Sequence, residues 1–97
     1  MYAVVLTYTA PLTEIDDHVP GHRAWLREQY DAGRLLVSGA RTPRTGGFLL
    51  FAAMPRPELD AALAEDPFAV NGLADAEIVE FRATSTVDAL AQWREPA

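Results

Sequence analysis

Four strand-like segments and two helix-like segments alternate along this chain in an order that few folds can accommodate. β-branched and aromatic residues mark the strands, and a 3.6-residue period of apolar side chains marks the helices. The predicted elements are, in chain order, a strand over 2–9, a helix over 20–32, strands over 34–40 and 48–54, a helix over 55–66 and a strand over 76–83. This β-α-β-β-α-β order predicts an α+β, ferredoxin-like fold with an antiparallel sheet and both helices on one face. We expect one domain over residues 1–97, with a short helix or arm over 84–97.

The predicted strands are apolar on both faces. Successive side chains of a strand point to opposite faces, so Val4 and Val5 lie on different sides of the sheet, as do Leu49 and Leu50. Because the two helices cover only one face, the other face needs a separate cover. A second copy of the chain is the simplest one, and we therefore expect a homodimer. The alternative is that segment 84–97 folds over this face.

Composition excludes several functional classes. The chain has no cysteine, which excludes disulfides, thiolate metal sites and a cysteine nucleophile. Its 14 acidic residues against eight arginines, with no lysine, give a net charge of −6, opposite to what a nucleic-acid-binding protein needs. The longest apolar run, Phe48 to Met54, is far shorter than the ~20 residues of a membrane span. With no basic leader visible, we expect a cytoplasmic protein.

His22 and Asp66 are the strongest candidates for catalysis. They lie 44 positions apart, but the predicted topology puts the start of the first helix and the end of the second at one edge of the sheet. Both residues also fall on the apolar face of their helix: His22 shares a face with Trp25, and Asp66 shares one with Leu63. A buried carboxylate needs a donor and a half-buried imidazole needs an acceptor, so the pair can satisfy each other. An Asp that holds one ring nitrogen makes the other a better base. The alternative that stays open is a structural hydrogen bond between helix ends.

The same edge should hold a substrate site. It collects the end of the first strand and the turn over 42–47, whose Thr, Pro and Gly residues are typical of a hairpin turn. The two arginines beside this turn either bind an anionic group or form a solvated loop. The residues that we expect to contact a substrate are Tyr8, Ser38, Arg41, Arg44 and Phe68.

Metal and serine chemistry are not predicted. His18 and His22 have a spacing that can hold zinc, but Pro20 lies between them and no third ligand is evident. Ser38 lacks the glycine-flanked elbow of a serine nucleophile. We therefore expect neither a metal ion nor a cofactor.

Several segments together resemble the YciI-like (YCII-related) proteins over about residues 2–82. The segments are His22-Arg-Ala-Trp-Leu, Ala32-Gly-Arg-Leu-Leu-Val-Ser-Gly39, Glu65-Asp-Pro-Phe-Ala-Val-Asn-Gly-Leu73 and Glu77-Ile-Val-Glu-Phe81. The resemblance implies a ferredoxin-like fold that pairs as a dimeric α/β barrel, with His22 and Asp66 as the active-site pair. The chain departs from many relatives by having Gly39-Ala40 in place of Gly-Pro and a shorter following loop. One branch of the family removes HCl from a chlorinated hydroxyquinol, and related barrels isomerise lactones or oxidise quinols.

Two classes of function follow from these residues. The first is a small cofactor-independent enzyme, a lyase or isomerase, in which the His–Asp pair moves a proton on a small cyclic or aromatic metabolite. The second is a module of the same fold that binds a small molecule, or another subunit, without converting it. The sequence does not separate them.

Overall fold

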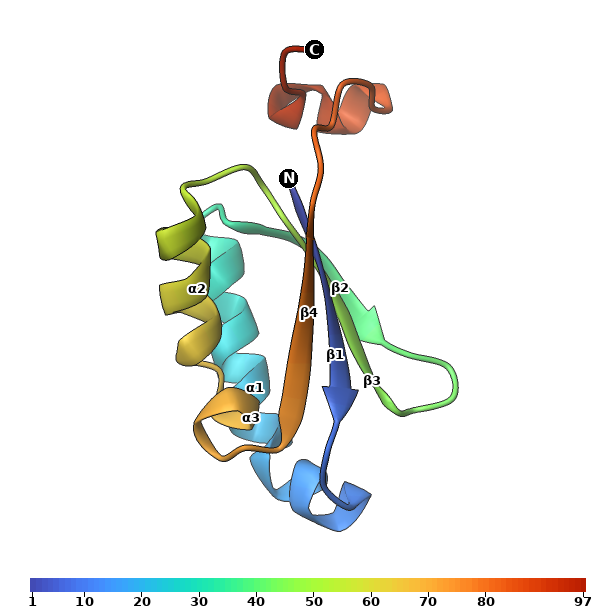
Figure 1. Cartoon of the computed structure of the whole chain (residues 1–97), viewed down its shortest axis with the longest axis vertical. Helices are drawn as coiled ribbons and strands as arrows, with labels where there is room; N and C mark the ends of the chain where they lie inside the picture. The colour runs from blue at the N-terminus through green and yellow to red at the C-terminus, as the bar shows by residue number, and fades with distance from the viewer.

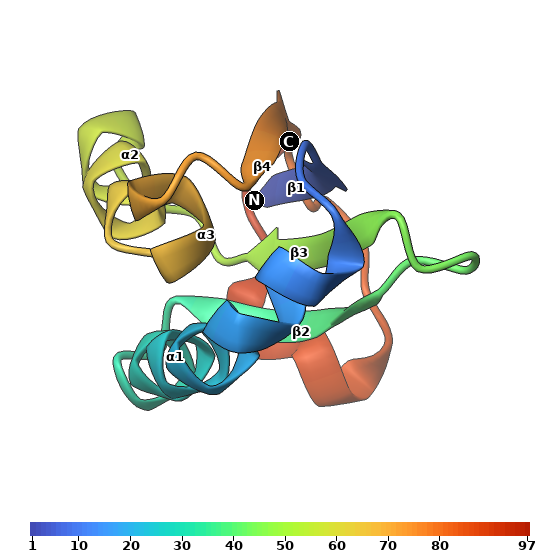
Figure 2. The same ribbon diagram turned by 90° about the horizontal axis from the view of Figure 1, so that it is seen from below.

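The four predicted strands pair into one antiparallel sheet in the order β2-β3-β1-β4. The computed structural model describes all 97 residues and has strands β1 (Tyr2–Tyr8), β2 (Leu35–Ala40), β3 (Gly46–Phe51) and β4 (Ala74–Glu80). Helices α1 (Leu12–Asp31), α2 (Arg56–Ala64) and the short α3 (Pro67–Val70) all lie on one side of the sheet (Figures 1 and 2). The predicted ferredoxin-like α+β fold is therefore confirmed.

The core lies between the sheet and the two long helices. Val4 at the centre of β1 pairs with Leu49 of β3 and with Ile78 of β4, and all three side chains point towards the helices. The indole nitrogen of Trp25 donates to the carbonyl oxygen of Ala62 at 2.9 Å, which fixes α1 against α2. The largest core cluster contains Tyr2, Val4, Leu6, Trp25, Leu35, Leu49, Phe51 and Leu59.

Helix α1 begins at Leu12, so the prediction that this helix starts at residue 20 was wrong. Pro20 lies inside the helix, where its ring removes one backbone donor but does not end the helix. The extra turns are held by Ile15, which is fully buried against Phe68 and Leu73 in a second core cluster. This tertiary contact outweighs the polar composition of the segment.

The other departures lie at the two turns near the predicted site. The helix expected over 55–66 is α2, which ends at Ala64, and a separate short helix that was not expected, α3, begins after Asp66. Gly46 and Gly47 are not part of the hairpin turn but form the start of β3. Gly46 is required there, because a Cβ atom would lie 1.8 Å from the carbonyl oxygen of Leu6 on the neighbouring strand.

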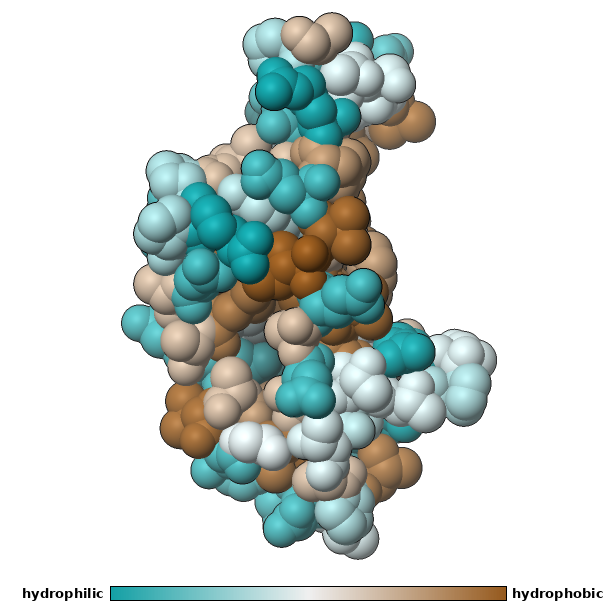
Figure 3. Space-filling view, in the orientation of Figure 1, coloured by the Kyte–Doolittle hydropathy of each residue, from teal (hydrophilic) through white to brown (hydrophobic).

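The face of the sheet opposite the helices remains apolar and open. Val37, Phe48, Val79 and Phe81 are 40–50% exposed on this face, and the apolar surface near β4 can be followed in Figure 3. The terminal segment, with its 3₁₀ helix η1 (Asp88–Trp93), lies beyond the end of the sheet that carries the N-terminus (Figure 1) and leaves these side chains exposed. No helix is both long enough and apolar enough to cross a membrane.

Candidate active site

His22 and Asp66 form the predicted hydrogen bond. The Nδ1 atom of His22 lies 2.8 Å from Oδ1 of Asp66, and the two side chains are 14% and 3% exposed. An ionised carboxylate only accepts, so Nδ1 donates in this hydrogen bond, and in the neutral imidazole Nε2 keeps its lone pair. His22 lies in the middle of α1 rather than in its first turn, because α1 begins earlier than predicted. Helices α1 and α3 approach closely at Gly21 of α1, where the absence of a side chain leaves room for the ring of Pro67.

The carboxylate is positioned by the local sequence Asp66-Pro67-Phe68. Proline at residue 67 favours extended backbone at Asp66, which has φ −60° and ψ 126°, and suits the first position of a new helix. Asp66 is then the N-cap of α3, and its Oδ1 also accepts from the backbone N–H of Phe68 at 3.1 Å. Asp66 was expected at the end of the second helix, but as the N-cap of α3 it stands at a helix N-terminus, which favours a carboxylate, and its Oδ1 is held facing His22.

Two aromatic rings stack on the imidazole of His22. Phe68 stacks on His22 with ring centroids 4.2 Å apart and planes 12° apart, and Trp25 stacks at 5.8 Å and 29°. Tyr8 in turn meets Phe68 edge to face. With Nδ1 bonded to Asp66, the imidazole has one polar atom left for a ligand, Nε2.

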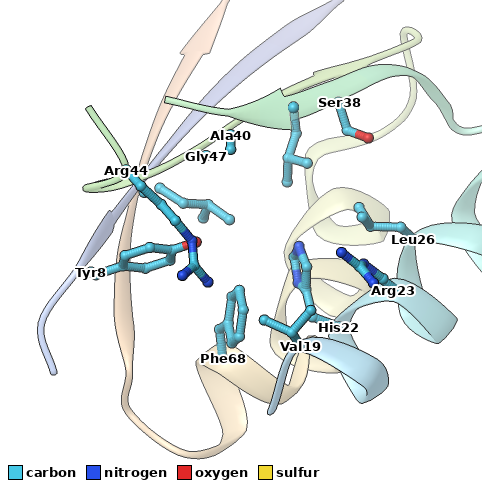
Figure 4. Close-up of a pocket in the computed structure, with 14 residues that line it drawn as sticks. Tyr8, Val19, His22, Arg23, Leu26, Ser38, Ala40, Arg44, Gly47 and Phe68 are labelled. Carbon is cyan, nitrogen blue, oxygen red and sulfur yellow. The ribbon is translucent and has the colours of Figure 1, made fainter. Parts of the chain in front are cut away.

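A cavity of about 230 Å³ lies beside this ring, between α1 and one end of the sheet (Figure 4). Small residues line it where β2 ends and β3 begins, namely Gly39, Ala40, Gly46 and Gly47. Half of the wall is apolar, and the polar groups come from α1, β1, β2 and the β2–β3 loop. The 14 lining residues are Leu6, Tyr8, Val19, His22, Arg23, Leu26, Ser38, Gly39, Ala40, Arg44, Gly46, Gly47, Leu49 and Phe68.

The structure brings four of the five expected substrate-binding residues to this wall. Ser38 lines it from β2, with its hydroxyl 2.6 Å from that of Tyr30, and Tyr8 and Phe68 lie across from it. Arg44 reaches the wall from the β2–β3 loop. Arg41 does not, because its guanidinium turns to the sheet and donates to the Thr7 hydroxyl at 3.0 Å.

Arg44 is held in place by Asp16 of α1. Its Nη2 donates to Oδ1 of Asp16, and this hydrogen bond is the main reason that the pKa of Arg44 is raised above its usual value. Because the loop and the first turns of α1 are joined by this pair, the guanidinium stays beside Tyr8 at the cavity (Figure 4).

Sequence reasoning missed the contribution of α1 to the cavity wall. Val19, Arg23 and Leu26 line it together with His22. Their spacing of three to four residues is that of one helix face, so the period around His22 was the signal that could have identified them. Arg23 is exposed and lies at the rim of the cavity.

No group of three or more His, Asp or Glu side chains comes together in a way that could hold a metal ion. His18, the one other histidine, lies near the side-chain amide of Asn71, at 3.4 Å, and not beside His22. Nor is Ser38 bonded to the imidazole. The pair that the fold does bring together is the imidazole of His22 and the carboxylate of Asp66.

Comparison with known proteins bears on the fold and the family of the chain. No curated protein matches the chain. Among solved structures, a similar fold is that of the 5-chloro-2-hydroxyhydroquinone dehydrochlorinase TftG from Burkholderia phenoliruptrix AC1100, determined in complex with 2,5-dihydroxybenzoquinone. It is 21% identical, has a TM-score of 0.70 and covers 84% of this chain and 94% of its own. The model of the YCII-related domain matches residues 1–82, so the chain belongs to the YCII-related family.

Proposed function

We propose that this protein is a small enzyme that moves a proton on a cyclic or aromatic metabolite, with His22 as the base and Asp66 as its positioning partner. The observation that carries the proposal is the 2.8 Å hydrogen bond between Nδ1 and the carboxylate beside an open cavity. This bond favours the tautomer whose Nε2 accepts a proton, and it stabilises the imidazolium that forms.

The size and chemistry of the cavity favour a substrate with one ring. A cavity of about 150 Å³ is enough for benzene, so 230 Å³ accommodates a single substituted ring. The stacked aromatic side chains and apolar wall exclude water from the base. Within this space His22 could catalyse an isomerisation, a cyclisation or an elimination, as a lyase or isomerase. None of these changes the oxidation balance, so the side chains suffice and we propose no cofactor.

Elimination of HCl is the reaction to examine first. A base takes one proton from the substrate, the electron pair left behind moves through the ring, and chloride leaves, so neither an oxidant nor a reductant is consumed. The structurally similar dehydrochlorinase acts on 5-chloro-2-hydroxyhydroquinone. This compound therefore serves as the first test substrate, with hydroxylated quinols and lactones after it.

We also propose that the working unit is a homodimer in which two sheets pack face to face. Four large apolar side chains stand 40–50% exposed on the helix-free face, in continuity with the half-buried Val5 and Leu50. The surface of one chain, 5840 Å², is somewhat larger than the roughly 5,500 Å² typical of a compact monomer of 10.6 kDa. The exposed apolar side chains favour a partner of the same shape on this face.

The test of activity compares the protein with His22→Ala and Asp66→Asn. Chloride release and hydrogen–deuterium exchange at substrate carbon atoms in D₂O are measured by ion analysis and NMR. We expect His22→Ala to lose turnover by about 10²–10⁴-fold while still folding, since this is the usual contribution of a general base. Arg27→Gln, one turn along the same helix, is the control. If the protein binds these compounds but neither releases chloride nor exchanges protons, it is a binding module and the enzymatic proposal is wrong.

A further inference from the structure

The cavity wall has a charge opposite to that of the whole chain. The chain carries 14 acidic residues against eight arginines, a net charge of −6. Yet none of the 14 residues that line the cavity is acidic, and two of them, Arg23 and Arg44, are arginines. Asp66 and Asp16 lie behind the wall, bonded to His22 and Arg44, so the charged groups that the wall itself presents to a ligand are cationic and suit a negative ligand.

Arg23 has no counter-charge. It follows His22 directly on α1 and lines the cavity, but its guanidinium forms no ion pair and no hydrogen bond within the chain. In contrast, Arg34 and Arg56 pair with nearby acidic residues on the surface. The five donors of the Arg23 guanidinium therefore remain available for a ligand.

Arg44 approaches from the other side of the imidazole. Figure 4 shows its guanidinium beside Tyr8 on one side of His22, while Arg23 lies on the other. Asp16 accepts from only one of its nitrogens, so further N–H groups can still donate. The two cations are thus presented from separate elements, the loop and α1, with the aromatic rings between them.

We propose that the ligand of this cavity is an anion carried on a single ring, a carboxylate or phenolate, and that Arg23 and Arg44 bind its negative oxygen atoms. This inference rests on the proposed function, because it assigns a substrate class to the same cavity. Guanidinium groups bind such oxygens through charge-assisted hydrogen bonds, and the rings of Phe68 and Tyr8 offer a flat surface to the carbon skeleton. The same cations would stabilise negative charge that develops when His22 removes a proton.

The test is a binding experiment that does not depend on turnover. Benzoate and benzamide have nearly the same shape and differ in charge, and each is titrated into the homogeneous protein by calorimetry and NMR. We expect benzoate to bind at least about tenfold more tightly than benzamide, with an affinity that falls as salt is added. Arg23→Gln and Arg44→Gln should each weaken benzoate binding by about tenfold and leave benzamide unchanged.

Two matched variants serve as controls. Arg27→Gln removes an arginine from the same helix outside the cavity wall, and Arg41→Gln removes one from the same loop that turns to Thr7 instead. Both should bind benzoate as the unmodified protein does. Equal affinity for the two probes, no saturable binding of either, or equal losses in all four variants would overturn the proposal. Because His22→Ala should keep the preference for benzoate, loss of turnover and loss of anion binding are separable outcomes.

Discussion

Replacing Asp66 by Asn separates the two roles that its side chain fulfils. Oδ1 accepts from the Phe68 N–H at 3.1 Å as a helix cap and from His22 at 2.8 Å. Asn caps helices about as well as Asp, whereas removal of a cap costs ~1 kcal/mol. A hydrogen bond to a charged group contributes roughly 1.5–3 kcal/mol, against roughly 1 kcal/mol for a neutral one. Asp66→Asn should therefore lower the free energy of unfolding by ~1 kcal/mol, and Asp66→Ala by ~2.5–4 kcal/mol.

Thermal unfolding followed by circular dichroism, at one protein concentration, measures this difference. A loss of ~1 kcal/mol lowers the Tm of a domain of this size by about 4–8 °C. The control is Asp60→Asn, which breaks an exposed i,i+4 pair with Arg56 and should cost no more than ~0.5 kcal/mol. Turnover of Asp66→Asn should fall, because Asn no longer selects the required tautomer. Equal destabilisation by Asn and Ala, or none by either, would refute this division of roles.

Three further changes test other parts of the structure. Val79→Arg, on the helix-free face of the sheet, should halve the mass measured by light scattering, because it puts a charge into the proposed dimer interface. Val70→Arg on α3 is the control and should leave the mass unchanged. A dimer that survives Val79→Arg argues against face-to-face packing. Gly46→Ala should destabilise the protein by ~1–3 kcal/mol in a denaturant titration, because the new Cβ would meet the backbone of Leu6. Gly39→Ala is the control, since a Cβ there meets open space. Equal Cm values for the two variants would contradict this explanation. Hydrogen bonds from the Ala83 N–H and from the N-terminal ammonium lower the pKa of Glu95. The stability that this carboxylate contributes is therefore present above the usual pKa of a glutamate and is lost as the pH falls through the lowered pKa of Glu95. Hydrogen exchange in segment 84–97 should then rise on acidification, and Glu95→Gln should raise it at neutral pH; an unchanged rate in both cases would exclude this anchor.

The arrangement of the strands and the meeting of His22 with Asp66 followed from the sequence because topology fixes them. Once the β-α-β-β-α-β order is known, the start of one helix and the end of the other share an edge of the sheet. The alternation of apolar residues put Val4 and Val5 on opposite faces of the sheet, and in the structure Val4 is fully buried while Val5 is half-buried. These are regular periodic signals that depend on many residues at once.

What could not be predicted depends on single long-range contacts. Residues 12–19 are polar and precede Pro20, so only the burial of Ile15 against Phe68 shows why they are helical. In the β2–β3 loop, Arg41 and Arg44 look alike in sequence. The structure separates them because one donates to Thr7 and the other to Asp16, and these partners lie more than 25 residues away.

The protonation of the His22 ring is the most direct test of the account. The chain has two histidines, so long-range ¹H–¹⁵N correlation of the imidazoles gives two sets of signals, and His18→Asn assigns them. When the ring is neutral, we expect His22 to carry its proton on Nδ1, which is bonded to Asp66. Its Nε2 should be unprotonated, and the Nε2 signal should move when a ligand enters the cavity. In Asp66→Asn this tautomer should lose its dominance. A His22 ring protonated on Nε2 in the unmodified protein, or one whose Nε2 ignores every ligand that binds, would contradict the assignment of His22 as the base.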